Sequence, residues 1–472
     1  MRLLLLILFI GTLFTSIVYA ASPVVSGNYE TGTFRNGEYP LLFEKHKRMI
    51  GGEIQSFAFP VREKEFRHDL CDSCFWKING TLNASVWNSG FGGEAYVSGF
   101  VDSLDFDIDA KFNWIRESDK NFAELDGESV HELWDDGDDW INYTRYRGHV
   151  GYNYAWLRME VGRDAMHWGP GYYNNLTLNR QAVPYNYFSV NLVFGPLRVI
   201  SFYSKMRIDS ANVYTHEKYD RNLYGHRYEF SLGKATIGVN ELQIVYNENN
   251  PWLIVPIFPL FIEKGNYSEE NNNGALSFDI NYQIGKLARI YGEFFLDDMD
   301  SPIAVIKSKY LDSEWAWMLG AQIGHDFSLD GNLLQLGTIF EISHIEQLVY
   351  SHYASCQGQM ANAGKPLGNS IGPNSRKIDW LIYGKYIQNN GNVWTASLLQ
   401  ELSWKGNNYG SDINQDIRPG VSPQMKKNYL GGAKMHYSIT PSLTFMHQHW
   451  GVSGSFRFGY EAETEVKGWV KW

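Results

Sequence analysis

The sequence ends in the stretch FRFGYEAETEVKGWVKW, residues 456–472, in which two kinds of side chain alternate without interruption. The even-numbered positions are mostly apolar or aromatic, and six of the eight odd-numbered positions are charged. Because successive side chains of a β-strand point to opposite faces, this pattern predicts one apolar face and one wet face. A strand of a soluble sandwich can alternate in the same way, but globular strands usually stop near ~5–6 residues, whereas bilayer strands need ~9–11. The length therefore favours a membrane barrel strand, and its last residue, Trp472, is the expected contact with the barrel-assembly machinery.

The same alternation recurs in residues 104–114, 276–284 and 288–296, where apolar residues alternate with polar ones such as Asp105 and Asp107. A Lys or Arg that faces lipid at the bilayer midplane costs roughly 2–4 kcal/mol. The charged positions are therefore expected to face an aqueous lumen, while the apolar positions contact outer-membrane lipid.

Short and long connections alternate between these stretches, as in barrels with short periplasmic turns and long external loops. The short turns are expected near Val101-Asp102, Gly148, Gly195-Pro196, Gly233-Lys234, Gly285-Lys286, Asp330 to Asn332, Asn389 to Asn392 and Thr440-Pro441. The long polar stretches are 117–138, 163–187, 208–225, 247–274, 298–313, 346–377 and 405–427. With two short external connections near 88–91 and 451–454, the tally predicts an all-β, transmembrane antiparallel β-barrel of about eighteen strands with both termini in the periplasm.

The beginning of the chain has the features of a secretory signal peptide, residues 1–20, with Arg2 before an apolar run and a small-residue cleavage site at Ala20. Residues 21–75 lack the strand rhythm, and we expect a short periplasmic extension, a lumen plug or a disordered leader before a barrel over 76–472. No later apolar run approaches the ~20 residues of a membrane helix. Export, 15% aromatic residues and 45 glycines favour the outer membrane of a Gram-negative bacterium.

The formal net charge of −11 argues against nucleic acid as a partner, and against strongly anionic partners. Cys71 and Cys74 form a lone CxxC pair without a second pair or a nearby set of histidines. This favours a periplasmic disulfide or two ordinary thiols over a redox or metal site. We expect no cofactor and no metal ion.

Residues 162–184, which begin GRDAMHWGPGY, resemble the signature of the Wzi-type capsule-assembly family. Two further blocks, residues 292–299 and 364–375, are similar to blocks of that family, and the resemblance covers roughly 140–472. It implies a large outer-membrane barrel that binds capsular or extracellular polysaccharide and attaches it to the cell surface without catalysis. Family members can carry a periplasmic helical bundle before the barrel, and the short stretch before the first strand departs from that pattern.

The loop 163–187 is the candidate site, either for binding sugar or for closing the pore. Flat aromatic faces can pack on pyranose rings, and imidazole, amide and guanidinium groups can bind hydroxyls or carboxylates. Gly169, Pro170 and Gly171 are expected to form a tight turn. The alternative is a structural loop folded into the mouth, with its aromatic residues packed on the barrel wall. The candidate polysaccharide-binding residues are His167, Trp168, Tyr172, Tyr173, Asn175 and Arg180, with Asn174 and Asn179 as further amide partners.

Two other functions are compatible with this architecture. An eighteen-stranded barrel is wide enough for a diffusion channel for small solutes unless loops fill it. A barrel enzyme or a Ca²⁺ site could use the acidic run within residues 131–139, but no Ser or second spaced His completes a catalytic set, and the run lacks the spacing of a known Ca²⁺ loop. The acids that would give a channel a cation-leaning lumen are Asp105, Asp107, Asp109, Asp279 and Glu293.

Overall fold

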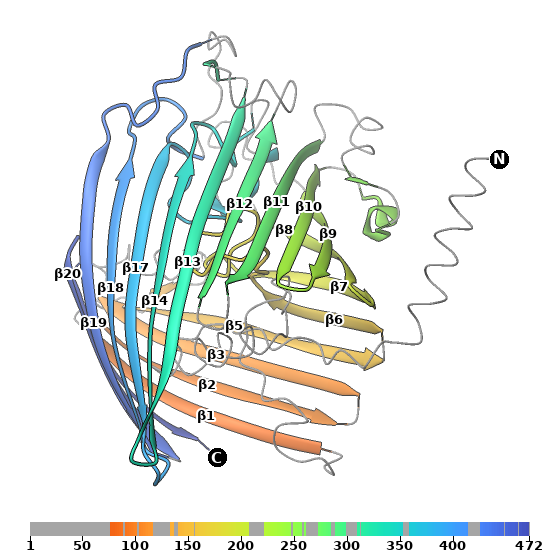
Figure 1. Ribbon diagram of the computed structural model, residues 1–472. Coiled ribbons are helices and arrows are strands. Elements are labelled where there is room, and N and C mark those ends of the chain that lie inside the picture. The colour runs from red at the N-terminus through yellow and green to blue at the C-terminus, as the bar shows by residue number, and fades with distance from the viewer. Residues whose placement is uncertain are drawn as a thin grey trace.

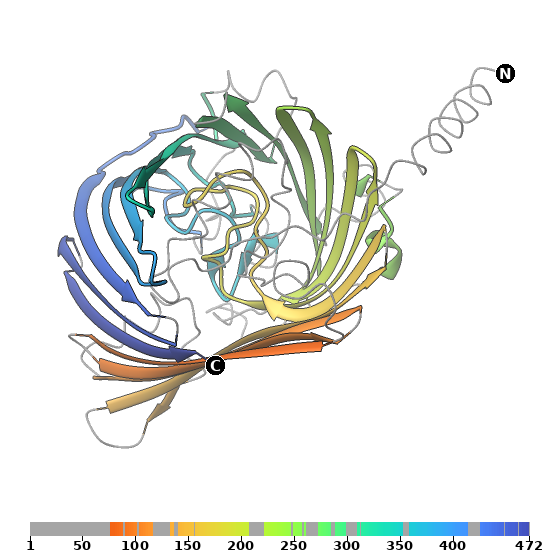
Figure 2. The same ribbon diagram turned by 60° about the horizontal axis from the view of Figure 1, so that its bottom comes forward.

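Eighteen antiparallel strands form one closed wall in the computed structural model (Figures 1 and 2). The structure describes residues 76–87, 90–101, 103–116, 133–135, 140–154, 156–206, 221–246, 249–256, 259–260, 272–284, 288–298, 309–311, 313–352, 358–413, 425–447, 449–460 and 462–471. The predicted signal peptide, residues 21–75, both members of the CxxC pair and Trp472 lie outside these residues.

The wall consists of β1 (Trp76–Trp87), β2 (Gly90–Val101), β3 (Leu104–Arg116), β5 (Trp140–Tyr154), β6 (Leu157–Asp164), β7 (Tyr185–Phe194), β8 (Leu197–Met206), β9 (Arg221–Leu232), β10 (Ala235–Tyr246), β11 (Asn272–Ile284), β12 (Ala288–Asp298), β13 (Glu314–Leu329), β14 (Asn332–Ile345), β17 (Ser375–Ile387), β18 (Val393–Lys405), β19 (Lys434–Met446), β20 (Trp450–Gly459) and β21 (Glu463–Lys471). The remaining elements are β4 (Leu133–Asp135), which pairs with β5, the short helix η3 (Pro251–Ile254), and the hairpin of β15 (Ala361–Asn362) and β16 (Lys365–Pro366).

The wall closes between its first and last strands, because residues 81–87 of β1 pair with residues 465–471 of β21. Closure leaves no edge strand of the wall unpaired, which is the condition for a sheet to cross a bilayer. None of the helical segments described is long and apolar enough to cross a membrane.

The two faces of the wall differ in polarity, as the alternation predicts. In β11, the outward side chains of Phe278 and Ile280 are 44% and 48% exposed, while Asp279 and Asn281 are 4% and 1% exposed. The inward face is polar and still buried, since chain segments inside the barrel cover it. The prediction of apolar outer and polar inner positions is confirmed.

Two of the eight expected short turns are wrong, because the residues that suggested them lie inside strands. β5 runs through Gly148, where an added Cβ would lie 2.8 Å from the carbonyl oxygen of Asp107. This glycine permits close backbone approach, and the turn comes instead between β5 and β6. β19 runs through Thr440 and Pro441. These two residues have no partner in β20, and the pairing of the two strands resumes after them in the same register. The gap is expected because proline has no N–H to donate.

The final stretch of alternation contains two strands, and not the single strand predicted. β20 ends at Gly459, β21 begins at Glu463, and the connection expected at 451–454 is instead part of β20. Phe456 lies opposite Thr464. Because directly opposed residues share a face, even-numbered residues stay on the outside in both strands, and the alternation passes through the turn unchanged. A turn of the structure lies close to each turn that the sequence misplaced. The number of strands is therefore unchanged, and the prediction of eighteen is confirmed.

We expect Phe278→Arg to destabilise the folded barrel by roughly 2–4 kcal/mol, because the side chain faces outward near the middle of β11. Urea unfolding in phospholipid vesicles, followed by heat-modifiable gel mobility, measures the change. Phe278→Leu is the matched control and should shift the midpoint little. An arginine variant as stable as the leucine variant would contradict the outward, lipid-facing assignment.

Candidate functional site

Residues 165–184, here called the first inner loop, connect β6 to β7 by way of the barrel interior. Figure 2 shows this yellow segment inside the wall, beside cyan segments of the chain between β14 and β17. Residues 346–352 and 358–374 of that connection are here called the second inner loop. Residues 165–179 are all buried, so most of the first inner loop is enclosed by the rest of the protein.

Glu341 of β14 anchors the first inner loop by accepting hydrogen bonds from three successive backbone amides. The amides of Tyr173 and Asn174 donate over 2.8 and 2.9 Å, and that of Tyr172 donates to the second carboxylate oxygen. The hydroxyl of Tyr291 adds a fourth donor at 2.7 Å. A carboxylate with no exposed surface needs such donors, and successive amides of a turn form a concavity that suits an anion.

Glu293 of β12 anchors the next residues of the same loop. Its carboxylate accepts hydrogen bonds from the amides of Leu176 and Thr177 over 2.7 and 2.9 Å, and from the Thr177 hydroxyl. The sequence placed Glu293 in the lumen as a charge exposed to water. In the structure it is 3% exposed and binds backbone amides of the first inner loop.

Asn174 connects the first inner loop to the second and to the wall. Its side-chain amide donates to Asp379 of β17, and its carbonyl accepts from Asn369 of the second inner loop over 2.9 Å. The amide of Asn179 donates to the carbonyl of Leu367 over 2.8 Å. The first inner loop therefore binds residues almost two hundred positions further along the chain.

Tyr350 holds the two inner loops together from the second one. Its hydroxyl donates to the carbonyl of Leu176 over 2.8 Å and accepts from the amide of Asn369 over 3.2 Å. Burial raises the pKa of Tyr350 well above its usual range, so the hydroxyl keeps the proton that it donates. The described parts of the three blocks that suggested the family resemblance, residues 162–184, 292–298 and 364–375, therefore meet inside the barrel.

The aromatic candidates are packed against the protein. Trp168 is 0% exposed and places its ring edge-to-face with Phe202 of β8, with 5.2 Å between centroids. Tyr172 and Tyr173 are 3% and 5% exposed and pack edge-to-face at 4.8 Å. These rings could receive a sugar only after the loop had moved, so their binding of polysaccharide stays a prediction.

The tip of the first inner loop contains the glycines and two of the polar candidates. Gly169 has a φ of 113°, a backbone conformation that favours glycine. The amide of Gly171 donates to Asn175 Oδ1 over 2.6 Å, and its carbonyl accepts from His167 Nε2 over 3.0 Å. His167 and Asn175 are buried and thus contribute to the fold of the tip.

Arg180 is the only one of the six candidates that is not fully buried. Its guanidinium lies over the ring of Tyr172, 4.1 Å from the centroid, and donates to the Tyr172 carbonyl over 2.6 Å. The neighbouring Gln181 is exposed and accepts from the exposed hydroxyl of Ser370 over 2.9 Å. An accessible polar surface therefore exists where the two inner loops meet.

Sequence reasoning missed Glu341, Asp379, Asn369 and Tyr350 as parts of this assembly. The alternation places Glu341 and Asp379 on the inner face, but it places every acid of the same parity there and does not single out these two. What distinguishes them is their donors from the first inner loop, which are backbone amides for Glu341 and the side-chain amide of Asn174 for Asp379. These donors come from distant parts of the chain.

A second group of charges lies on the inner wall at β3, β5 and β6. Among the described residues, Asp105, His149 and Glu160 have the spacing of metal ligands. The guanidinium of Arg158 lies among them and donates to Asp105 over 2.6 Å and to Glu160. A cation already balances these carboxylates, so the group forms an ion-pair network of the wall. The side chains of the acidic run 131–139 lie outside the described residues.

Comparison with known proteins gives one family and one fold. The family model described as "Capsule assembly protein Wzi" matches residues 133–393, more than half of the 472 residues. The solved structure of Escherichia coli Wzi, described as a carbohydrate-binding β-barrel involved in group 1 capsule assembly, has a TM-score of 0.52 and 12% identity, covering 83% of this chain and 84% of that one. At this identity the likeness shows the fold. No protein with a curated description matches the sequence.

Two further solved structures of outer-membrane proteins match this chain with lower TM-scores. The Pseudomonas aeruginosa outer membrane protein OpdK has a TM-score of 0.42 and 10% identity, covering 84% of this chain and 98% of that one. A BenF-like porin from Pseudomonas fluorescens has a TM-score of 0.41 and 10% identity, covering 84% and 98% of the two chains.

Glu341→Gln should loosen the first inner loop, because one acceptor oxygen becomes a donor that faces amide donors. Hydrogen bonds to charged groups contribute about 1.5–3 kcal/mol each. We expect faster proteolysis within residues 165–184 and transient conductance in planar bilayers. Asp330→Asn, at an exposed turn, is the matched control and should leave both measurements unchanged. Equal behaviour of the two variants would contradict the anchoring role of Glu341.

Gly368→Ala should separate the two inner loops, since the new Cβ would lie 1.8 Å from the carbonyl oxygen of Leu176 and 2.5 Å from the Tyr350 hydroxyl. Overpacking of this kind costs typically 1–3 kcal/mol. A lower thermal unfolding midpoint in detergent is the expected result. Gly454→Ala in β20, where no atom lies closer than 3.9 Å, controls for glycine replacement. Equal thermal unfolding midpoints for both variants and the parent protein would refute the close packing of the two inner loops.

Proposed function

Because the chain belongs to the family of Wzi capsule assembly proteins, we propose that it binds capsular or another extracellular polysaccharide at the bacterial outer membrane and attaches it to the cell surface without catalysing a reaction. The observation that carries this proposal is the position of the family match along the chain. Residues 133–393 include both inner loops and the wall acids Glu293, Glu341 and Asp379 that anchor them. The part of the chain typical of the family is thus the part that fills the barrel.

The proposed orientation follows from the connections. Both the start of β1 and the end of β21 lie at the end of the barrel that carries the short turns, because the number of strands is even. Barrels of this kind place short turns in the periplasm and long loops outside. We therefore place both termini in the periplasm, where Trp472 fits recognition by the barrel-assembly machinery, and the long connections at the cell surface.

The filled lumen supports an attachment role over a diffusion channel. A barrel of this size conducts when its interior is open. Here the two inner loops are bound to wall carboxylates and to each other, and the segments that bind them are buried. A channel for small solutes remains the alternative, and it requires both inner loops to leave their places.

We propose that the polysaccharide first contacts Arg180 and the adjoining exposed Gln181 and Ser370. A guanidinium can hold the carboxylate of a uronic acid through two parallel hydrogen bonds, and its stacking on Tyr172 fixes its direction. His167, Trp168, Tyr173 and Asn175, together with Tyr172, would then position the loop and contact sugar rings only as it opens.

Arg180→Gln should lower the cell-bound fraction of polysaccharide several-fold in a deletion strain complemented with the variant, because the charged group that meets the glycan is lost. Bound and shed polysaccharide are measured after centrifugation, with the protein level checked on the same cells. Arg116→Gln, an exposed arginine at the end of β3, is the matched control.

Trp168→Ala combined with Arg180→Ala tests the candidate site as a whole. Unchanged retention of polysaccharide in the double variant would remove these residues from the site. Unchanged retention after deletion of the gene, together with large steady openings of the purified protein in planar bilayers, would instead favour the channel.

A further inference from the structure

Three polar side chains, here called the polar row, lie on the outer face of the wall at β8, β9 and β10. In the strand register, Ser201 lies opposite His226, and His226 lies opposite Glu241. Glu241 in turn lies opposite Leu276, which shares its face with the outward Phe278 two residues along β11. Because directly opposed residues share a face, the polar row points to the side of the wall on which the membrane lies.

The polar row is placed where lipid would otherwise meet the wall. It lies near the middle of its three strands. The same row of the sheet continues through apolar residues, with Met159 and Val190 on one side and Leu276 on the other. A histidine and a glutamate that met hydrocarbon there would be costly. The three side chains are only 1%, 0% and 4% exposed, so another part of the chain covers them.

Residues 249–256 and 259–260, here called the outer strap, provide this cover. They belong to the connection between β10 and β11 and include η3, which lies outside the ring of strands beside β8 and β9 (Figures 1 and 2). The sequence grouped residues 247–274 with the long external loops. In the structure, this part of the connection folds back over the outer face of the wall.

The polar row binds the backbone of the outer strap. His226 Nε2 donates to the carbonyl of Leu253 over 2.9 Å, and the Ser201 hydroxyl donates to the carbonyl of Ile254. A carbonyl at membrane depth needs such a donor, because lipid offers none. The polar side chains of the wall and the irregular backbone of the strap therefore satisfy one another.

Further contacts extend the attachment toward the end of the outer strap. Glu241 accepts a hydrogen bond from the amide of Leu260 over 3.2 Å. Leu253 and Leu260 are 3% and 1% exposed, and they pack in one apolar cluster with Tyr224 and Val245 of the outer wall. Hydrogen bonds and apolar packing thus fix the same segment to the wall.

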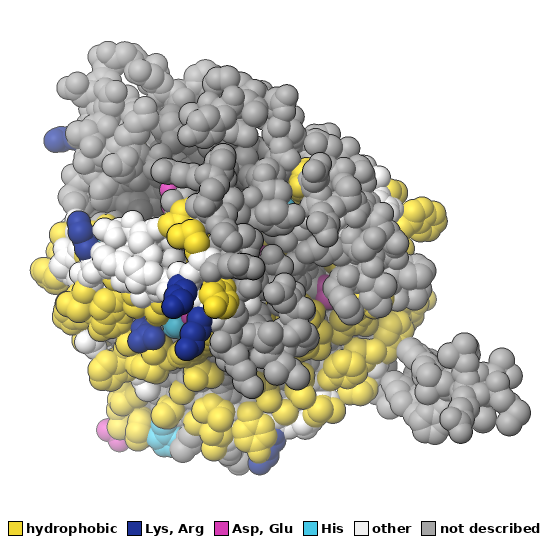
Figure 3. All heavy atoms as spheres, turned by 90° about the horizontal axis from the view of Figure 1, so that it is seen from above, with side chains coloured by type: hydrophobic (Ala, Val, Ile, Leu, Met, Phe, Trp, Pro, Cys, Tyr) yellow, Lys and Arg dark blue, Asp and Glu magenta, His cyan; other side chains and the backbone are white. Residues whose placement is uncertain are grey.

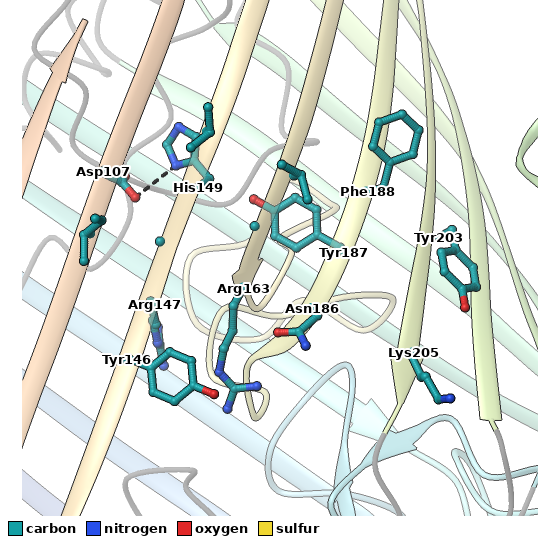
Figure 4. A pocket seen from close by; sticks show the side chains of 15 residues that line it. Asp107, Tyr146, Arg147, His149, Arg163, Asn186, Tyr187, Phe188, Tyr203 and Lys205 are labelled. Atoms are coloured by element: carbon teal, nitrogen blue, oxygen red, sulfur yellow. Dashed lines mark ion pairs between the residues drawn. The ribbon is translucent and has the colours of Figure 1, made fainter.

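A buried histidine of the inner face shows the difference between the two faces. His149 Nδ1 lies 3.0 Å from a carboxylate oxygen of Asp107, and both residues belong to wall strands (Figure 4). On the outer face, His226 Nδ1 lies 3.8 Å from Glu241, and the hydrogen bond of its other ring nitrogen goes to the strap. The outer strap, and not the polar row, is therefore the surface that the surroundings of the barrel meet.

The far side of the outer strap is apolar. Trp252 is 74% exposed and Pro251 is also exposed, whereas the next residue, Leu253, faces the wall. The side chain of Asn250 accepts from the amide of Trp252 over 3.1 Å, which fixes the start of η3. Figure 3 shows hydrophobic side chains along the described outer wall that is in view. A tryptophan on such a surface is typical of contact with a bilayer, whose boundary favours an amphipathic ring.

We propose that the outer strap is a lipid contact of the barrel, with Trp252 inserted into the lipid that surrounds the wall. The outward residues on either side of the strap, Met159 and Phe278, are 37% and 44% exposed and apolar. The strap therefore continues a lipid-facing surface across the polar row, which favours lipid over a second copy of the chain as its occupant. The contact lies on the opposite side of the wall from the inner loops, so it does not rest on polysaccharide binding.

Spin labelling of the full-length protein in phospholipid vesicles, at a low ratio of protein to lipid, tests this contact. The native cysteines Cys71, Cys74 and Cys356 are first replaced by serine, and a nitroxide is attached at Trp252→Cys. Its collisions with oxygen, which concentrates in lipid, are compared with those of a water-soluble nickel complex present on both sides of the membrane. We expect several-fold fewer collisions with nickel than at Asp330→Cys, on an exposed turn, and a pattern like that of Phe278→Cys.

Heat-modifiable mobility verifies that each variant is folded, and Pro251→Cys repeats the measurement should Trp252→Cys fail to fold. Collisions with nickel as frequent as at Asp330→Cys would overturn the proposal, because the strap would then face water. Rare collisions with both probes would also overturn it, because a protein surface such as a second copy of the chain would then cover the strap.

Discussion

The interior of this barrel depends on carboxylates of the wall that accept hydrogen bonds from backbone amides of a loop. Neither partner is stable in the lumen alone, because a buried carboxylate without donors and a buried amide without an acceptor each cost free energy. Glu341 receives the amides of residues 172–174, and Glu293 receives those of residues 176–177. The amides thus supply the donors that the carboxylates need, and the carboxylates supply acceptors for the amides. The buried loop is thereby held in one position.

This constraint explains how loops of the chain can be held in place inside a wide barrel. The first inner loop has little secondary structure of its own beyond a single bridge between Trp168 and Leu178. Its polar backbone atoms are satisfied by the wall and by the second inner loop, through Asn174, Asn369 and Tyr350. Both loops and the wall therefore form one cooperative unit, and movement of either loop would expose unpaired groups in the other.

The wall presents two surfaces that serve separate purposes. Its inner face holds the loops, and the exposed ends of those loops offer Arg180 to a ligand from the aqueous phase. The outward side chains of its strands are mostly apolar, as Phe278 and Ile280 of β11 illustrate. A charge on this face near the middle of a strand would be costly, because hydrocarbon would surround it there.

The sequence by itself determined the two-faced strands, their number and the closed architecture, because the polarity of each position depends only on its parity along a strand. It misplaced turns at Gly148 and Pro441, since glycine and proline also occur within strands, and it read residues 456–472 as one strand because the turn preserves parity. Only the tertiary structure decided what the loop 163–187 contacts. Its partners are as far along the chain as Asp379, and no local pattern records which amide will meet which carboxylate.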